Sequence, residues 1–160
     1  MNKHDLREQT VKWILDKGGN EFNLAITLTT DPKKYDFTVQ SRDKMDDMVS
    51  KELSYVRQKL NSYVYGSNWR RKNKNVLIAS FREEIHNQPH YHIALKVDAS
   101  NALNLVGDFV CETWRRTKYG GYSNKVVLID SASRWLNYCV KNLTALDTNT
   151  IDLSNTVLNK

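Results

Sequence analysis

The chain has few of the residues that stabilise secreted proteins and none of the long apolar runs found in membrane proteins. Its 160 residues include only two cysteines, Cys111 and Cys139, which is too few for a disulfide framework and indicates a reducing compartment. Residues 1–5 carry no apolar run, and no segment approaches the roughly 20 apolar residues of a membrane span. We therefore expect a soluble cytoplasmic protein without a signal peptide or a transmembrane segment.

Composition and charge indicate one globular domain with an anionic partner. Hydrophobic residues make up 40% of the chain, enough for a core, and no repeat or low-complexity tract is present. We expect a single domain over residues 1–146, followed by a loosely held tail at 147–160 that is rich in Asn and Thr. The net charge of +6 favours a polyanion such as nucleic acid as the partner.

Hydrophobic periodicity predicts alternating helices and strands. The N-terminal part, residues 1–20, contains one helix, at 4–17, and a core follows over 22–145. Within the core we expect strands at 22–29, 76–81, 90–97 and 125–129 and helices at 42–65, 99–116 and 132–145. This order predicts an α+β fold of the ferredoxin/RRM-like split-βαβ type: a central antiparallel sheet, two helices on one face and the other face open.

The strand at 90–97 carries two histidines one residue apart. His90 and His92 share one face because side chains alternate along a strand, and three of the four histidines (His86, His90, His92) fall within residues 86–92. If Tyr91 and the following apolar residues face the helices, both imidazoles face outward. The first strand then leaves Thr27 and Thr29 on the same side. Small side chains there would let a strand of nucleic acid approach the histidines.

Two glutamates precede the histidine strand and could complete a metal site. Glu84 falls on the histidine face if Phe81 points into the core, whereas a two-residue turn would place Glu83 there instead; we favour Glu84 and keep Glu83 as the alternative. A set of two nitrogens and one carboxylate with open positions suits Mn²⁺ and tolerates Mg²⁺. The ion would polarise a phosphoryl oxygen.

The last predicted helix places a tyrosine and a lysine on its polar half. At about 100° per residue, Tyr138, Lys141 and Arg134 fall on the face opposite the apolar residues. A phenol has a reference pKa of about 10, so Tyr138 needs a nearby positive charge to act as a nucleophile at neutral pH. Lys141, one turn later, could supply it.

Three segments together resemble the HUH endonuclease superfamily, in particular the rolling-circle replication initiators (Rep proteins) of plasmids and single-stranded DNA viruses. The apolar strand ending in Thr27-Leu28-Thr29 is similar to their first motif. His90-Tyr91-His92 resembles the His-hydrophobic-His motif, and Tyr138-Cys139-Val140-Lys141 resembles the Tyr-x-x-Lys motif. The resemblance covers about residues 22–145.

The resemblance implies a metal-dependent endonuclease that nicks and rejoins single-stranded DNA through a 5′-phosphotyrosine intermediate. It implies that Tyr138 is the nucleophile, that Lys141 assists, and that His90, His92 and one of the two glutamates bind Mn²⁺ or Mg²⁺. The substrate would be single-stranded DNA at an origin or a hairpin. A host helicase or polymerase is a further candidate partner, the protein would act as a monomer or homodimer, and a viral protein would work inside the host cell.

Two basic-aromatic loops and the last helix supply candidate DNA contacts, because cations bind phosphates and aromatic rings stack on bases. The predicted contacts are Thr27, Thr29, Trp69, Arg70, Arg71, Arg115, Arg116, Lys118 and Arg134. Two other functions are alternatives to the Rep-like interpretation. One is a small HUH transposase acting on hairpin ends, and the other is a non-catalytic RRM-like nucleic-acid-binding module.

Overall fold

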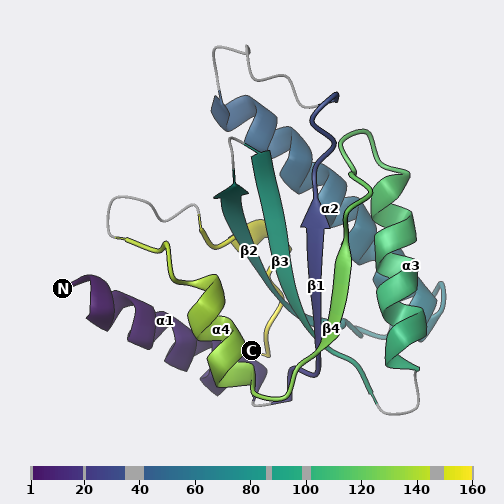
Figure 1. Ribbon diagram of the computed structural model, residues 1–160. Helices are drawn as coiled ribbons and strands as arrows, with labels where there is room; N and C mark the ends of the chain where they lie inside the picture. Colours follow the sequence, from purple (N-terminus) through teal and green to yellow (C-terminus); the bar gives the residue numbers. More distant parts are fainter. Residues whose placement is uncertain are drawn as a thin grey trace.

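The computed structural model describes residues 2–19, 21–34, 42–85, 88–98, 102–144 and 150–159. The elements, labelled in Figure 1, are α1 (Lys3–Gly18), β1 (Leu24–Thr29), α2 (Arg42–Tyr65), β2 (Leu77–Ile85), β3 (Gln88–Lys96), α3 (Leu103–Arg115), β4 (Lys125–Leu128), α4 (Ala132–Cys139) and the short 3-10 helix η1 (Leu153–Asn155). His86, singled out from the sequence, lies outside the described residues.

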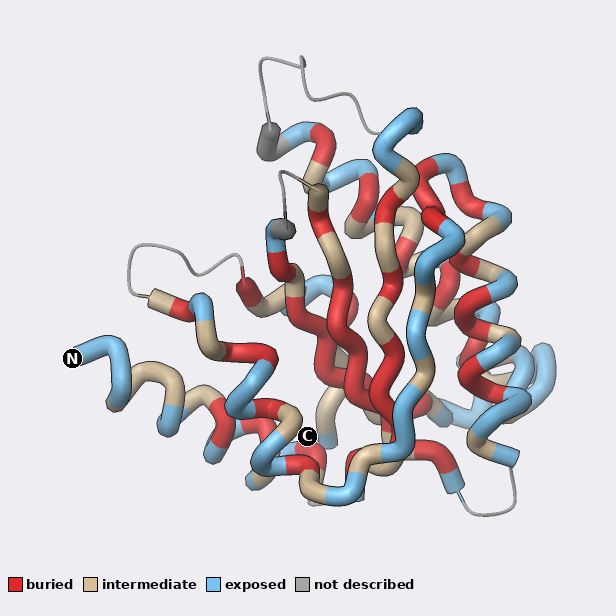
Figure 2. The backbone as a smooth tube through the Cα atoms, in the orientation of Figure 1, coloured by how far each residue is buried: buried red, intermediate tan, exposed pale blue. Residues whose placement is uncertain are grey.

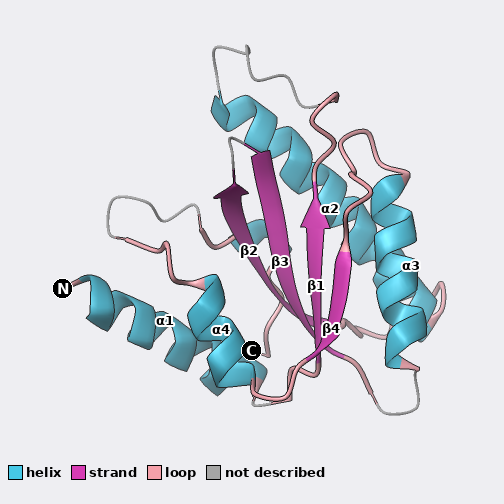
Figure 3. Cartoon of the chain, viewed as in Figure 1, coloured by secondary structure: helices cyan, strands magenta, loops and turns pink. Residues whose placement is uncertain are grey.

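The four strands form one antiparallel sheet in the order β2-β3-β1-β4. The two central strands, β1 and β3, come from the two halves of the chain, and each is separated from its parallel partner by one intervening strand. This is the split-βαβ arrangement, so the predicted α+β fold class is confirmed (Figure 3). None of the described helices is both long and apolar enough to cross a membrane.

One face of the sheet is covered by α2 and α3. Leucine, isoleucine and tyrosine side chains alternate along β1 and β3, and Ile26, Tyr91 and Ile93 are at most 1% exposed within this core. Leu53 of α2 and Trp114 of α3 pack against them. The predicted inward face of the histidine strand is therefore confirmed, and its even-numbered residues point to the other face.

The second face is only partly open, which corrects the expectation that it is free. A second core joins α1 and α4 to β2 and β3, with Ile14 and Leu136 packed against Phe81 and Ala94. The reason is that α4 is amphipathic: its apolar half needs a partner, and β2 offers one on this face. The uncovered part lies over β1 and β4, where Val127 is 43% exposed, and Figure 2 shows the contrast between β4 and the buried strands.

The C-terminal segment is packed on the outer edge of β2, so the prediction of a loosely held tail is wrong for residues 150–159. Ile151 and Val157 form antiparallel bridges with Phe81 and Ile78. Asn155 is fully buried, and its Nδ2 donates to the carbonyl oxygen of Ser50 at 2.9 Å. Polar residues with tertiary partners carry no periodicity, which is why the sequence did not reveal this contact.

The last helix is shorter than predicted. Ser131 caps its N-terminus by accepting a hydrogen bond from the backbone N–H of Arg134, and the helix ends at Cys139. Lys141 therefore lies in the turn that follows the helix. The backbone N–H of Lys141 donates to the carbonyl oxygen of Tyr138 at 3.2 Å, so this turn fixes the lysine close to the tyrosine.

Candidate active site

The register of the β2–β3 hairpin decides which glutamate lies beside the histidines. Glu83 pairs with His90, and residues paired in this way point to the same face. Glu84 pairs with Pro89 and points to the opposite face, where its Oε2 lies 3.9 Å from Nη2 of Arg82. The favoured placement of Glu84 on the histidine face is therefore wrong, and the alternative glutamate lies there.

The error in register has a simple physical origin. The predicted strand at 76–81 continues to Ile85, and Ile85 pairs with Gln88. Phe81 was expected to face the main core, but it pairs with His92 and packs in the second core with α4. Because both faces of β2 are buried, apolar residues on this strand do not mark a single inward side.

His92 is held in a fixed orientation by partners on both ring nitrogens. Its Nδ1 lies 3.1 Å from Oγ1 of Thr27 and its Nε2 lies 2.7 Å from Oε2 of Glu83. The residue is only 6% exposed. Thr27 was predicted to contact DNA. In the structure its hydroxyl group contacts Nδ1 of His92 and helps to orient the imidazole.

Glu83 is the point at which three segments of the chain meet. The residue is 8% exposed. Its carboxylate accepts from Lys141 Nζ at 2.7 Å through Oε1, the same oxygen that Asn142 Nδ2 approaches at 3.3 Å. Its other oxygen faces His92. A buried carboxylate is stable only when its charge and its lone pairs are compensated, and these contacts supply that compensation.

Hydrogen bonds within the site favour the charged forms of Glu83 and Lys141. Burial raises the pKa of Glu83, but hydrogen bonds from Lys141 and His92 outweigh it and hold the pKa below the ordinary value of 4.5. Burial lowers the pKa of Lys141, but hydrogen bonds to Glu83 and Tyr138 outweigh it and raise the pKa above 10.5. The site therefore holds a carboxylate and an ammonium group at neutral pH.

Tyr138 lies between the histidine and the lysine and is accessible from outside. Its ring packs edge-on against His92, with centroids 5.7 Å apart, and Lys141 Nζ lies 3.9 Å from the ring centroid. Half of the residue (50%) is exposed, whereas Leu136 and Cys139 of the same helix are buried against the sheet. The apolar half of α4 thus anchors the helix, and the polar half presents the tyrosine.

The three predicted metal ligands, His90, His92 and Glu83, lie on the same side of the sheet, because Glu83 pairs with His90 across the hairpin and contacts His92. Two ligands of one ion, each at about 2.1 Å and at right angles, lie about 3 Å apart. Nε2 of His92 and Oε2 of Glu83 are 2.7 Å apart and contact each other directly, so an ion bound by both groups would have to replace this hydrogen bond. The hydroxyl of Thr27, in contact with Nδ1 of His92, would orient the imidazole if its other nitrogen bound a metal. Within the described ranges, no three His, Cys, Asp or Glu side chains already form a metal-ligand group.

The predicted DNA contacts are divided between the two ends of the sheet. Trp69, Arg70 and Arg71 precede the start of β2, at the end opposite Glu83. Arg115 is the last residue of α3, and Arg116 and Lys118 follow it in the loop that meets the end of β1 near the histidines. The bridge between Thr30 and Gly120 makes this connection.

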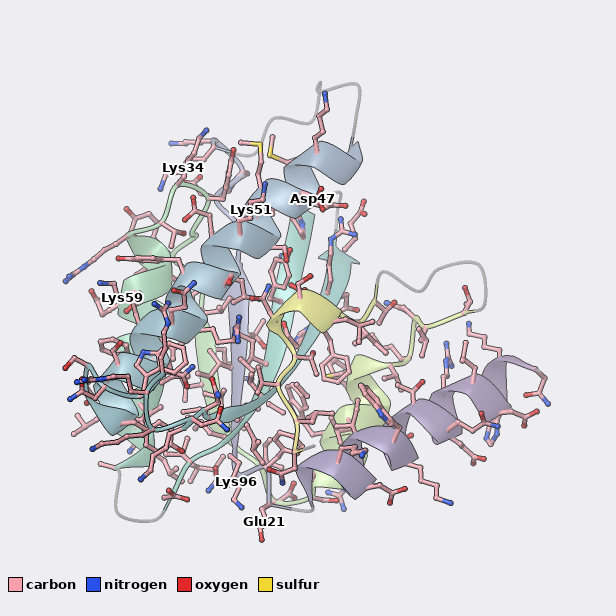
Figure 4. All side chains as sticks on the ribbon, turned by 180° about the vertical axis from the view of Figure 1, so that it is seen from behind. Glu21, Lys34, Asp47, Lys51, Lys59 and Lys96 are labelled. Atoms are coloured by element: carbon pink, nitrogen blue, oxygen red, sulfur yellow. The ribbon has the colours of Figure 1, made fainter. Side chains whose placement is uncertain are left out.

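Other cations lie both on the helix layer of the first face and on α4. Seen from behind, Lys51 and Lys59 lie along α2, in the helix layer that covers the first face of the sheet (Figure 4). Arg134 is exposed near the site on α4, where its Nη1 lies 3.3 Å from Asp130 Oδ2. Positive charge therefore surrounds the fold and does not by itself mark one DNA path.

Three residues near the site were given no role from the sequence. Asn142 donates to Glu83, Trp135 packs edge-on against His92 at 6.4 Å between centroids, and Asn124 Oδ1 accepts from the Thr29 backbone N–H at 3.0 Å. Asn142 follows Lys141 directly, so its position beside the lysine was a usable signal. Nothing in the local sequence connects Asn124 with β1, because that contact depends on the α3–β4 loop.

The chain was also compared with known proteins. No protein-family model, curated protein or solved structure matched it.

We predict that Glu83→Gln lowers the free energy of unfolding at about pH 7 by roughly 1–3 kcal/mol, because Lys141 and His92 lose their charged partner. The folded pKa of Glu83 lies below 4.5, so its contribution is present above pH 4.5 and is lost as the pH falls through the folded value. Urea denaturation should therefore show a smaller difference from the wild type at about pH 3.

Glu84→Gln is the matched control for this measurement. Its carboxylate lies 3.9 Å from the Arg82 guanidinium on the other face, and an ion pair of this kind contributes less than about 1 kcal/mol. Equal losses for the two variants, or a Glu83→Gln effect that does not change with pH, would contradict the central position of Glu83.

Proposed function

We propose that the protein is a metal-dependent endonuclease that nicks and rejoins single-stranded DNA at a specific site through a 5′-phosphotyrosine intermediate. The observation that carries the proposal is the meeting of Tyr138, Lys141, His92 and Glu83 in one contact group. These residues come from three separate segments of the chain. A tyrosine on the surface for solubility alone would not require contacts with both a lysine paired to Glu83 and a buried histidine, so the arrangement supports a functional role for Tyr138.

The proposed reaction is a transesterification at phosphorus. The Tyr138 Oη attacks the phosphodiester, a bond from Oη to phosphorus forms, and the bond from phosphorus to the 3′ oxygen breaks. The phenolic proton passes to solvent, and the leaving 3′ oxygen takes up a proton to become a hydroxyl group. Rejoining is the same reaction in reverse, so no external energy source is required.

Lys141 and Glu83 prepare the tyrosine for this step. The Lys141 ammonium group, 3.9 Å from the Tyr138 ring centroid, stabilises negative charge on the phenol and on the phosphate. Glu83 holds that ammonium group in place at 2.7 Å. Lys141 is therefore proposed as a catalytic residue, and Glu83 both positions the lysine and contacts Nε2 of His92 through its other carboxylate oxygen.

His90, His92 and Glu83 would hold the divalent cation, Mn²⁺ or Mg²⁺. When bound, such an ion polarises a phosphoryl oxygen and neutralises charge that develops in the transition state. The two histidines would supply imidazole nitrogens from the same side of β3. Thr27 keeps His92 correctly turned.

The substrate would reach the site along the uncovered part of the second face. Val127 is 43% exposed there, and the basic loop after α3 adjoins the same end of the sheet. Single-stranded DNA exposes the phosphate and bases that this surface could contact. We propose initiation of rolling-circle replication in the cytoplasm or inside a host cell as the process, with a host helicase as the partner that unwinds the strand.

We predict that the wild-type protein with Mn²⁺ and a single-stranded DNA library forms an adduct that survives SDS electrophoresis, and that Tyr138→Phe reduces its yield on the order of 10⁴-fold or more. The variant lacks the attacking oxygen and keeps the ring that packs on His92. Tyr55→Phe is the control, because Tyr55 is similarly exposed (47%) but lies on α2. An adduct that persists in Tyr138→Phe would remove this residue as the nucleophile.

We also predict that His90→Ala and His92→Ala each abolish cleavage and leave most of the salt-sensitive DNA binding, because the phosphate contacts lie elsewhere. EDTA should stop cleavage by the wild type, and added Mn²⁺ should restore it. The measurements are adduct yield and fluorescence anisotropy with the same labelled DNA. Equal cleavage with and without EDTA would exclude the proposed metal.

A further inference from the structure

A cavity of about 340 Å³ adjoins the candidate site at the carboxyl end of β1. This volume lies at the small end of the range for ligand pockets, about 300–1,000 Å³. Its walls come from the end of β1, the start of β3 and the loop between α3 and β4. The lining includes Thr29, Asp31, Gln88, His90, Tyr122 and Ser123.

The cavity opens on the same face as the candidate metal ligands. Gln88, His90 and His92 alternate along β3 and therefore point to one side, and Thr29 pairs with His90 from β1. His90 belongs to both places, since it lines the cavity and faces Glu83 across the hairpin. Adjacent strands are about 4.8 Å apart, so Thr29 and Glu83 lie roughly 10 Å apart on either side of His90.

Tyr122 is the most exposed of the large hydrophobic residues described, at 70%, yet its loop is held firmly against β1. The backbone N–H of Gly121 donates to the carbonyl oxygen of Thr29 at 2.7 Å. A Cβ added to Gly121 would lie 2.7 Å from that same oxygen, so only glycine permits the approach.

Two side chains strengthen the attachment of this loop. The Trp114 indole Nε1 donates to the Thr29 carbonyl oxygen at 2.7 Å, and Asn124 joins the backbone N–H of Thr29 to the carbonyl oxygen of Gly121. The loop that carries Tyr122 is thus ordered before any ligand arrives. An exposed aromatic ring on a loop whose backbone is already held can stack on a flat ligand without the cost of ordering the loop.

The chemistry of the lining favours a base over a phosphate. The described lining residues include no lysine or arginine, and Asp31 contributes a carboxylate that repels phosphate. The nearby cation Lys34 already has two partners, since its Nζ lies 3.7 Å from Asp31 Oδ2 and 3.5 Å from the Gly120 carbonyl oxygen. The amide of Gln88, with a donor and an acceptor, can pair with the edge of a base, and a carboxylate accepts from an exocyclic amino group.

We propose that this cavity binds one nucleobase of the single strand, adjacent to the phosphodiester that is cut. The base stacks on Tyr122, and its edge is read by Gln88 and Asp31. The inference rests on the proposed nicking activity and extends it, because it assigns sequence selectivity to a specific pocket. In this arrangement the scissile phosphate lies over the histidines, with Tyr138 on one side and the bound base on the other.

The test sequences the DNA strands captured as adducts from a library of single-stranded DNA with a random segment. The wild type should show a base preference of roughly 10-fold or more at one position next to the cut. Gln88→Ala should reduce the preference at that position to within about twofold and leave the other positions unchanged. Tyr122→Ala should lower the adduct yield for every sequence by roughly 10-fold. An abasic nucleotide at that position should not lower the adduct yield of the Tyr122→Ala variant any further, because the ring that stacks on the base is already absent.

Tyr55→Ala, which removes an exposed ring far from the cavity, should leave the profile unchanged. A wild-type adduct with a profile unaltered by Gln88→Ala and Tyr122→Ala would overturn the pocket but not the nicking activity. If the wild type forms no adduct, the nicking proposal fails, and the pocket is tested by selecting bound strands from the same library with Tyr138→Phe protein. Equal preferences with and without Tyr122→Ala in that selection would overturn the pocket as well.

Discussion

The buried carboxylate of Glu83 is the group on which the rest of the site depends. It faces Nε2 of His92 at 2.7 Å and Nζ of Lys141 at 2.7 Å, and so fixes a strand residue and a turn residue relative to each other. Burial of this charge is tolerated because both partners and Asn142 compensate it. Lys141 in turn lies over the ring of Tyr138. The tyrosine is thereby positioned through a chain of contacts that begins in β2.

The fold and part of the site followed from the sequence. Alternation along the histidine strand predicted which side of β3 is buried, and helical periodicity predicted the elements, because both depend on local spacing. The choice between Glu83 and Glu84 did not follow, since β2 is buried on both faces and its length is set by pairing with β3. The packing of residues 150–159 was missed because Asn155 is held by tertiary hydrogen bonds.

The helices bury only part of the second face of the sheet, and the candidate site lies at the edge of the buried part. α1 and α4 bury the second face over β2 and β3, and the C-terminal segment borders β2, so this part of the face is covered. β4 and the end of β1 stay accessible, with Val127 and Tyr122 exposed. Tyr138 lies at the margin of the covered part. A strand of DNA on the open part would thus meet the tyrosine from one side and the cavity beside His90 from the other.

Mass spectrometry of the covalent protein–DNA product tests the central claim most directly. Trypsin cleavage after Arg134 and Lys141 releases residues 135–141, in which Tyr138 is the sole tyrosine. We predict a nucleotide attached through its 5′ phosphate to Tyr138 in this peptide. A nucleotide attached to any other residue, or cleavage of DNA without a covalent product, would contradict it.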